Sequence, residues 1–389
     1  MKITTLQENF KFGLFTVSHI TGKNVNLPIL NNVLIKTETG GIKLITTNLE
    51  IGIISTIRGK VEKEGSFTVD AKIISDYIGL LPNKKVSVEQ KENDLLMNCE
   101  NYKTKINGQS AEEYPLIPKV DKKIYYSAQI NEFKQALSQV IFAVSTSEAR
   151  MELSGVLFSF TNNNLTMAAT DSYRLAEKKI NIKTNSEEDK NIIVPAKTLQ
   201  ELIRILSGGP DAGEVGNEIM EIKFYLSENQ ILFTHGSTEL VSRLIEGQYP
   251  DYKQIIPVNI KTNIEINKAE LVRAVKVASL FSKTGINDIN LDFPAGKNQA
   301  VISSVSGQTG ENITGLDAQV KGDDNSMVIN HRYLLDGLNN INSEMIKIEV
   351  IDSNTPCILR PSVSAAPSGA AAGKGKNEDY LYIIMPIKQ

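Results

Sequence analysis

The sequence has few of the residues that build catalytic or metal sites. Its 389 residues include only two cysteines and three histidines. Two cysteines cannot form a disulfide framework or a cysteine-rich zinc site, and the apolar, strand-like surroundings of Cys99 and Cys357 predict buried thiols. His19, His235 and His331 are not spaced for metal binding. We expect surface or packing roles for them, and no metal or cofactor.

Sequence motifs of catalysis are also missing. No GxxxxGK[ST] phosphate loop occurs, and no GxGxxG follows a strand. Asp288 and Asp292 would share one face of a strand and could suggest a two-metal site, but no other acidic partner is close to them in sequence. Thr170, Asp171 and Ser172 are better explained by a polar turn than by a nucleophile, because no base is evident beside them. The sequence therefore predicts a protein that is not an enzyme.

No long hydrophobic run is present either. No window reaches 18 uninterrupted apolar residues, which argues against a membrane span. The N-terminal MKITTLQENFKF lacks the apolar core of a signal peptide, so we expect a cytoplasmic protein. The net charge of −3 argues on average against nucleic-acid binding. That argument concerns only the average, because screening limits exposed charges to about 10 Å and one surface can still be basic.

What the sequence does contain is weak internal self-similarity. A shift of 123 residues pairs Phe10 with Phe133 and stays in register, without a gap, to the pair Asn48 and Asp171. A fainter third copy begins near Ile266. We therefore expect three domains, over residues 1–120, 124–250 and 251–389.

Each copy has the pattern of an α+β unit. A first helix shows one apolar stripe, which in the second copy is formed by Phe133, Leu137, Val140, Ile141 and Val144. Strand-like alternation follows, as in GVLFSF and NLTMAAT. Second helices are predicted over Ala71–Leu81, Ala196–Leu206 and Tyr333–Leu338. Two helices on an antiparallel sheet form an α+β fold, and open strand edges favour sheets that continue from one copy into the next.

Four segments connect or interrupt the copies. Residues 112–123 and 246–257 carry proline and tyrosine beside acidic residues, which is typical of ordered crossings. Residues 207–218 and 361–379 are predicted to be disordered, the second because it is rich in alanine, glycine, serine and proline. The 361–379 segment would be a flexible insertion in the third domain.

Four sequence signatures resemble one known family in order and spacing. They are LPILNNVLI (27–35), MAATDSYRLA (167–176), RLIEGQYPDYKQIIP (243–257) and YLYIIMPIKQ (380–389). Together they resemble the bacterial sliding clamp, the beta subunit of DNA polymerase III, over the whole chain. The resemblance implies a head-to-tail homodimer in which six domains close a ring around duplex DNA. It also implies a non-catalytic processivity factor for the replicative polymerase.

The resemblance places helices on the inner wall of the ring, where phosphates are contacted without sequence preference. Candidate lining residues are Lys11, Lys72, Lys134, Lys197, Arg204, Arg273 and Lys276. The family's DNA contacts map to Asn24, Lys72 and Ser147, and Lys23, Arg150 and Lys197 complete the expected DNA-binding set. The family often has arginine at the position of Asn24, which makes this one contact weaker. An ordinary solvated helix face explains any single lysine equally well.

The resemblance also implies a peptide-binding groove between the second and third copies. Its expected walls are Leu153, Thr170, Ser172, Tyr173, Arg174, Leu175, Pro250, Gln254 and Ile255, with Ile383, Ile384, Met385, Pro386, Ile387 and Lys388 from the tail. Apolar walls suit the side chains of a short extended peptide, and Arg174 and Lys388 could bond its backbone or an acidic residue. The expected clients are the polymerase alpha subunit, the clamp loader, other polymerases and repair proteins. The competing interpretation is that the tail is only a final core strand.

Leu280 and Phe281, at the end of the third copy's first helix, are the expected apolar dimer-interface residues. Two other functions compete with a DNA clamp. A peptide-binding scaffold without DNA encirclement would share the groove but not the basic pore. An enzyme acting on nucleotides would show turnover in the presence of metal ions.

Overall fold

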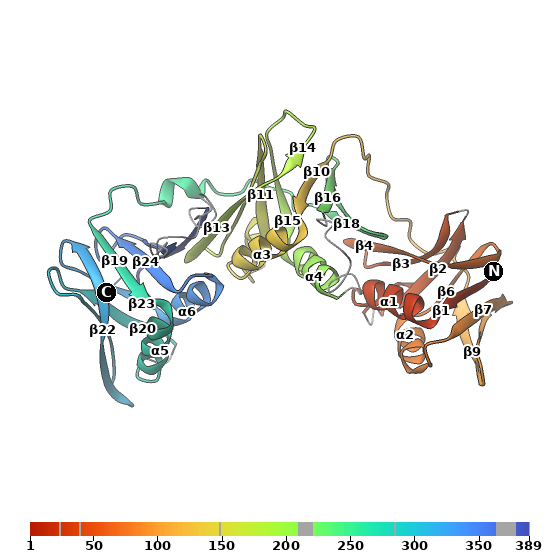
Figure 1. Ribbon diagram of the computed structural model, residues 1–389, viewed down its shortest axis with the longest axis horizontal. Coiled ribbons are helices and arrows are strands. Elements are labelled where there is room, and N and C mark those ends of the chain that lie inside the picture. The colour runs from red at the N-terminus through yellow and green to blue at the C-terminus, as the bar shows by residue number, and fades with distance from the viewer. Residues whose placement is uncertain are drawn as a thin grey trace, which may run out of the picture. The chain divides into compact units, whose positions relative to one another are not determined.

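The computed structural model of the chain describes residues 1–22, 25–38, 40–147, 149–208, 221–283, 285–362 and 379–388 (Figure 1). The chain forms two compact units. Unit 1 comprises residues 1–134, 182–188 and 194–245, and unit 2 comprises residues 135–181, 189–193 and 246–389. The division runs through the second repeat, so that helix α3 (Ile130–Ile141) and strand β15 (Lys190–Pro195) contribute residues to both units.

Unit 1 is built on a 14-stranded sheet with the order β14-β10-β16-β17-β18-β4-β3-β2-β6-β9-β8-β7-β1-β5. Its strands are β1 (Lys2–Leu6), β2 (Asn32–Glu38), β3 (Gly41–Thr47), β4 (Ile51–Ile57), β5 (Gly59–Lys63), β6 (Gly65–Asp70), β7 (Lys85–Lys91), β8 (Asp94–Cys99), β9 (Tyr102–Gln109), β10 (Tyr126–Gln129), β14 (Lys183–Thr184), β16 (Glu221–Leu226), β17 (Gln230–His235) and β18 (Thr238–Arg243). Its helices are α1 (Gln7–Ser18), α2 (Ala71–Leu80) and α4 (Ala196–Ser207), and α1 and α2 lie side by side (Figure 1).

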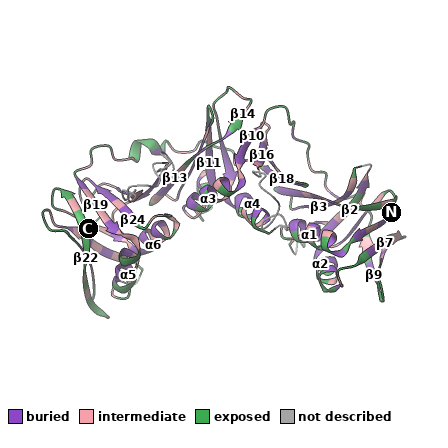
Figure 2. Cartoon of the chain, in the orientation of Figure 1, coloured by how far each residue is buried: buried purple, intermediate pink, exposed green. Residues whose placement is uncertain are grey.

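The sheet of unit 1 passes from the second repeat into the first. Strand β18 pairs antiparallel with β4, and Leu240 lies opposite Ile53. This pairing confirms the expectation that open strand edges of neighbouring copies would join. The core follows from alternation along the strands, because every second residue of β3 faces the helices and is buried, as Ile42 and Leu44 are (Figure 2).

Unit 2 is built on a 12-stranded sheet with the order β15-β11-β12-β13-β26-β25-β24-β19-β22-β21-β20-β23. Its further strands are β11 (Gly155–Thr161), β12 (Asn164–Thr170), β13 (Arg174–Asn181), β19 (Thr262–Asn267), β20 (Asp288–Phe293), β21 (Gln299–Ser306), β22 (Gly310–Gly322), β23 (Asn325–Asn330), β24 (Met345–Val350), β25 (Cys357–Ser362) and β26 (Tyr380–Ile384). Its helices α5 (Lys268–Ser279) and α6 (His331–Asn340) also lie side by side (Figure 1). Strand β13 pairs antiparallel with β26, and Ala176 lies opposite Tyr382.

The predicted α+β class, with two helices and antiparallel strands in each repeat, is confirmed. The second helices of the first two copies end within one residue of their predicted bounds. Helix α6 is longer than predicted, because it begins at His331, where the Asn330 side chain accepts a hydrogen bond from the backbone N–H of Arg332 at 2.9 Å. Of the two segments predicted to be disordered, residues 209–218 and 363–378 lie outside the described residues.

Both linkers are tied to neighbouring strands by tyrosines. In the linker over residues 112–123, Tyr114 is buried and donates to the backbone oxygens of Asn32 and Ile45, at 3.2 and 3.3 Å. In the linker over residues 246–257, Tyr252 is buried and donates to the carboxylate of Glu177. These contacts agree with the prediction of ordered crossings.

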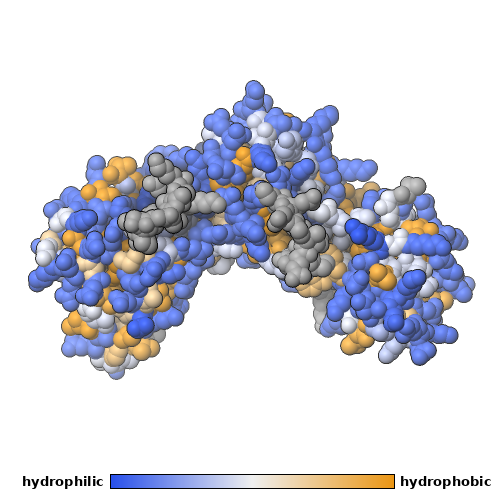
Figure 3. Space-filling view, viewed as in Figure 1, coloured by the Kyte–Doolittle hydropathy of each residue, from blue (hydrophilic) through white to orange (hydrophobic). Residues whose placement is uncertain are grey.

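Among the described residues, no helix is both long and apolar enough to cross a bilayer. The face of the molecule shown in Figure 3 is mostly hydrophilic, with scattered apolar residues.

Candidate functional site

A tight polar turn between β12 and β13 forms the base of the site in unit 2. The Asp171 carboxylate accepts hydrogen bonds from the backbone N–H groups of Tyr173 and Arg174, at 3.0 and 3.1 Å. The Thr170 hydroxyl closes the turn by donating to the backbone oxygen of Arg174 at 2.6 Å. Ser172 adopts a φ of 79°, in the left-handed region. Short polar side chains stabilise such turns, so the sequence TDSYR is a structural turn, as predicted.

The chain's tail completes one wall of this site. Strand β26 lies between β13 and β25 in the sheet and is buried along its length. Beyond the strand, the Met385 backbone N–H donates to the backbone oxygen of Tyr173 at 2.9 Å. The Ile387 backbone N–H donates to the backbone oxygen of Val328 at 2.7 Å. The tail is thus a core strand up to Ile384 and a surface segment after it.

A cavity of about 180 Å³ lies beside the turn and the tail. It is lined by Arg150, Leu153, Thr170, Ser172, Arg174, Pro250, Asp251, Tyr252, Ile255, Ile383 and Met385. Eight of these residues belong to the predicted groove, and they come from four separate stretches of the sequence. Asp251 and Tyr252 were not predicted, although they lie in the quoted segment 243–257. A 3₁₀ turn, Tyr252–Ile255, brings them to the cavity, and no periodic pattern of residues predicts this turn.

The other predicted groove residues do not line this cavity. Leu175 and Ile384 are fully buried in the sheet. Tyr173 is 62% exposed, and its ring stacks on that of Tyr333 at 6.3 Å. Gln254 donates to Asp251 at 2.8 Å. Pro386, Ile387 and Lys388 follow Met385 along the surface.

Arg174 is committed to contacts within the protein. Its Nε donates to Asp171 Oδ2 at 3.0 Å, one terminal nitrogen donates to the backbone oxygen of Phe142 at 2.9 Å, and the other donates to Asp336. The guanidinium also lies over the Tyr333 ring, 4.7 Å from its centre. The side chain is only 11% exposed. It therefore borders the cavity as part of its wall, and its expected bond to a peptide stays a prediction.

The predicted DNA-facing residues have different environments. In unit 1, Lys11 on α1, Lys72 on α2 and Lys197 on α4 are exposed. In unit 2, Arg273 and Lys276 on α5 are exposed. Lys134 is half-buried.

Arg204 is bonded to other residues of unit 1. Its terminal nitrogens donate to the backbone oxygens of Phe15 and Thr16, at 3.0 and 2.7 Å, near the C-terminal end of α1. One terminal nitrogen also pairs with the Glu201 carboxylate at 2.6 Å, and the Glu201 side chain is only 4% exposed. Cations stabilise the C-terminal ends of helices. Arg204 therefore joins α4 to α1, and a place for it on the wall of a pore stays a prediction.

The remaining predicted DNA contacts are divided. Lys23 and Asn24 lie outside the described residues. Ser147 is exposed in the loop after α3. Arg150 lines the cavity described above, where its side chain bonds Glu152 at 2.9 Å and the Ser172 hydroxyl at 3.2 Å.

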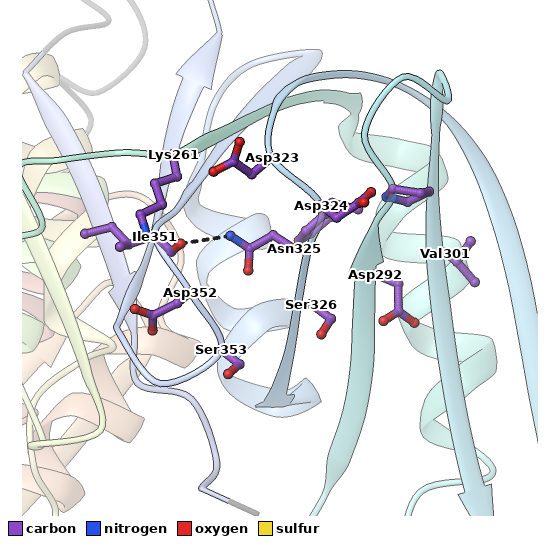
Figure 4. A pocket seen from close by; sticks show the side chains of 12 residues that line it. Lys261, Asp292, Val301, Asp323, Asp324, Asn325, Ser326, Ile351, Asp352 and Ser353 are labelled. Carbon is purple, nitrogen blue, oxygen red and sulfur yellow. Dashed lines mark hydrogen bonds between the residues drawn. The ribbon is translucent and has the colours of Figure 1, made fainter.

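A second cavity, of about 610 Å³, lies at the ends of the strands in the third repeat (Figure 4). Its lining includes Asp292, Asp323, Asp324 and Asp352, with Lys261. Burial raises the pKa of Asp292. Among the described residues, no group of three or more histidine, cysteine or acidic side chains could hold a metal ion.

Asp288 and Asp292 do share one face of β20, as predicted. The Asp288 carboxylate accepts a hydrogen bond from the Lys283 backbone N–H at 3.2 Å and pairs with the Lys283 side chain at 4.0 Å. Asp288 is also not among the residues that line the 610 Å³ cavity. The two carboxylates therefore have separate environments.

Three repeats of two helices and antiparallel strands, with sheets that run from one repeat into the next, define the class of DNA-clamp folds. The solved structures of that class agree. A putative DNA polymerase III beta subunit from Eubacterium rectale is 26% identical, with a TM-score of 0.88 and 100% coverage of both chains. The sliding clamp of Bacillus subtilis is 25% identical, with a TM-score of 0.89, and 100% of this chain and 99% of that chain are covered. The clamp of Pseudomonas aeruginosa, solved bound to griselimycin, is 22% identical, with a TM-score of 0.89 and 100% coverage of both chains.

Three family models of the DNA polymerase III beta subunit together match most of the chain. The N-terminal domain matches residues 1–118, the central domain 128–251 and the C-terminal domain 253–368. The beta sliding clamp of Staphylococcus epidermidis RP62A is 30% identical over 373 residues, covering 93% of this chain and 96% of that protein. That of Staphylococcus aureus Mu50 is 30% identical over 398 residues, covering 100% and 99%. The chain therefore belongs to the family of DNA polymerase III beta subunits, the bacterial sliding clamps, which confirms the resemblance seen in the sequence.

Proposed function

We propose that the chain acts as a homodimeric ring that encircles duplex DNA, holds the replicative polymerase on it and catalyses no reaction itself. The observation that carries this proposal is the way in which the sheets continue from one repeat into the next. Two of these joins lie within the chain. In each unit, part of one further strand pairs on one side only: residues 102–107 of β9 pair with β8, and residues 310–317 of β22 pair with β21. A second copy of the chain would supply the missing partners and close the ring.

The two internal joins have the same register. Leu240 of β18 lies opposite Ile53 of β4, and Tyr382 of β26 lies opposite Ala176 of β13. In the first repeat, strand β9 corresponds to β18 and β26. Thr104 of β9 corresponds to Leu240 of β18, because Thr104 lies opposite the buried Met97 and Leu240 lies opposite the buried Phe233.

In the third repeat, strand β22 corresponds to β4 and β13. Asn312 of β22 corresponds to Ile53 of β4, because Asn312 lies opposite Ser304 and Ile53 lies opposite Thr46. Ser304 and Thr46 are equivalent, because each hydroxyl donates at 2.6 Å to a carbonyl near the end of the first helix of its repeat. The same register across a dimer puts Thr104 of one protomer opposite Asn312 of its partner, and Lys105 opposite Glu311.

Exposed apolar residues flank both open edges. Leu280 and Ile313 are each 70% exposed beside β22, and the Phe281 ring lies next to Gly310 at the start of that strand. On the other side, Tyr102 begins β9 and Ile73 is 54% exposed on α2. Burial of such residues stabilises subunit contacts, which supports the expected interface role of Leu280 and Phe281.

Cysteine cross-linking tests the register. Residues directly opposite one another in antiparallel strands are close enough for a disulfide, and the native Cys99 and Cys357 are buried. A chain carrying Thr104→Cys and Asn312→Cys should form covalent dimers under mild oxidation. The matched pair Thr104→Cys and Leu316→Cys, four residues out of register, should not. A stable 42.9 kDa monomer in light scattering would reject the ring.

The exposed basic residues on α1, α2, α4 and α5 are proposed to face the DNA. Phosphate contacts of this kind carry no sequence information and weaken with salt. A ring loaded on circular DNA should stay bound and be released when the circle is cut. Lys72→Glu with Lys197→Glu should weaken loading or sliding without breaking the dimer. Lys60→Glu with Lys91→Glu, which changes the same charge at exposed positions in strands, is the control.

The 180 Å³ cavity is proposed as the centre of a groove for short linear peptides from the polymerase alpha subunit, the clamp loader, other polymerases and repair proteins. Apolar side chains such as Leu153, Ile255, Ile383 and Met385 give it an apolar lining, with polar groups at the turn. Griselimycin, which was solved bound to the Pseudomonas aeruginosa clamp, is a suitable small probe.

Met385→Ala should weaken binding of the alpha subunit and of griselimycin, whereas Val258→Ala, at an 85% exposed residue outside the cavity lining, should not. A truncation should begin at Pro386, because Ile384 is a buried strand residue. If peptide binding is retained but circular DNA is not, the chain is a peptide-binding scaffold rather than a clamp.

A further inference from the structure

Asp336 on α6 does not line the cavity, yet it reaches the cavity wall through Arg174. Its carboxylate pairs with a terminal nitrogen of Arg174. The Arg174 side chain is 11% exposed, while that of Asp336 is 47% exposed. No sequence signature pointed to Asp336, which lies 162 residues from Arg174 along the chain.

The aromatic ring of Tyr333 provides a second link between α6 and the turn. The Arg174 guanidinium lies over this ring, 4.7 Å from its centre, and Tyr173 stacks on the same ring at 6.3 Å. Two consecutive residues of the turn therefore rest on one helix. A planar guanidinium can use its donors in several directions while its face packs on a ring, and Arg174 does both.

Helix α6 is itself held firmly against the tail strand. A side chain at Gly337 would collide with the Tyr382 ring, so the helix approaches β26 closely at this point. The Tyr382 hydroxyl donates to the backbone oxygen of Tyr333 at 2.8 Å. Tyr382 is fully buried. The helix is thus a fixed support for the more exposed turn.

The turn carries three of the cavity-lining residues, Thr170, Ser172 and Arg174. The Tyr173 backbone oxygen in the same turn accepts a hydrogen bond from the Met385 backbone N–H at 2.9 Å, and Met385 also lines the cavity. A change in the position of Arg174 would consequently move both walls.

We infer that Asp336 is a positioning residue for the peptide groove: it holds Arg174 on α6 and so fixes the shape of the turn that receives the peptide. The inference rests on the proposed groove. It assigns Arg174 to the wall of the site, with its charge satisfied by Asp171 and Asp336, instead of to direct recognition of the peptide.

The test compares Asp336→Asn with the matched control Asp323→Asn, a carboxylate-to-amide change in the other cavity of the same repeat. The affinity for griselimycin and for the polymerase alpha subunit is measured with each full-length dimer. We expect Asp336→Asn to weaken both affinities by about fivefold, because the amide oxygen can still accept from Arg174 but lacks the charge that strengthens this hydrogen bond, and Asp323→Asn to leave them unchanged. Asp336→Glu, which keeps the charge, should recover part of the loss.

Two results would overturn the inference. Unchanged affinity in Asp336→Asn would mean that Asp171 alone sets the position of Arg174. Tighter binding would mean that Arg174, once released, contacts the peptide directly. Failure of the wild-type chain to bind either probe would instead count against the proposed groove.

Hydrogen exchange tests the positioning role without any ligand. The amides of Ser172, Tyr173 and Arg174 should exchange faster in Asp336→Asn than in Asp323→Asn, because the turn loses its support. Equal exchange rates in the two variants would refute the positioning role, whatever the binding data show.

Discussion

The join between the first two repeats (β18 with β4) and the join between the second and third repeats (β26 with β13) have similar contacts in different surroundings. In each, a strand pair continues the sheet and an arginine bonds a backbone oxygen at the end of a first helix. Arg204 bonds Phe15 and Thr16 at the first join, and Arg174 bonds Phe142 at the second. The acidic partners on the second helices differ in exposure, since Glu201 on α4 is 4% exposed and Asp336 on α6 is 47% exposed. Asp171, the other partner of Arg174, is 15% exposed.

This difference in exposure distinguishes the first join, which is structural, from the second join, which borders the proposed binding site. At the first join the carboxylate is desolvated, so its loss of a partner would leave a buried charge. At the second join the partner is accessible to water and the arginine borders a cavity, so the contact contributes less to stability and more to local shape. Two arginines from different elements, helix α4 and strand β13, therefore have different roles at the two joins.

The largest effect is expected at the first join. Arg204→Ala leaves Glu201 with His19 as its remaining partner, at 2.6 Å. Removing one member of a buried ion pair costs about 3 kcal/mol, so the opening free energy of the α1 and α4 amides, measured by hydrogen exchange, should fall by about that amount.

Lys197→Ala is the control for Arg204→Ala, because it removes an exposed cation from the same helix. It should change stability by less than about 0.5 kcal/mol. If both variants were equally stable, the Arg204–Glu201 ion pair would contribute no more to stability than a surface salt bridge does. The contrast with the second join would then fail.

The roles of these arginines could not be predicted from the sequence, although much of the fold could. Local periodicity identified the helices, since a stripe such as Phe133, Leu137 and Val140 needs only one segment of chain. The contact of Arg204 with Thr16 links residues that are 188 positions apart. No pattern within either segment distinguishes a cation facing solvent from one that caps a distant helix.

The candidate site shows the same limit. The family resemblance identified eight of the residues that line the cavity, but it also included Leu175 and Ile384, which are buried in the sheet. Tyr252 was missed because its place depends on a short 3₁₀ turn. A signature marks a segment, whereas alternation in a strand and the twist of a turn decide which of its side chains reach the cavity.

The linker tyrosines provide a second, smaller contrast. Tyr114 bonds two neutral backbone oxygens at the first join, and Tyr252 bonds the Glu177 carboxylate at the second. Hydrogen bonds to charged groups contribute more, so Tyr252→Phe should cost about 2 kcal/mol and Tyr114→Phe about 1 kcal/mol in urea denaturation. The reverse order would show that burial of Tyr114, rather than the charge on its acceptor, controls the effect.

The smallest effect concerns acid and the helix that supports the second join. Burial lowers the pKa of His331, at the start of α6, and the neighbouring Arg332 lowers it further. Its buried Nδ1 has no hydrogen-bond partner among the described residues. The folded state therefore binds this proton less readily than the unfolded state does, so stability should decrease as the pH falls through the unfolded value near 6.5.

His331→Gln removes this titration and should flatten the stability of unit 2 between about pH 7 and pH 5, as measured by the urea midpoint at each pH. His235→Gln, in unit 1, is the matched control and should keep the wild-type slope. Because α6 holds the turn through Asp336, the affinity of the wild-type groove should weaken over the same pH range as α6 loosens. An equal acid response in wild type and His331→Gln would place the acid sensitivity outside α6 and leave the two joins alike in this respect.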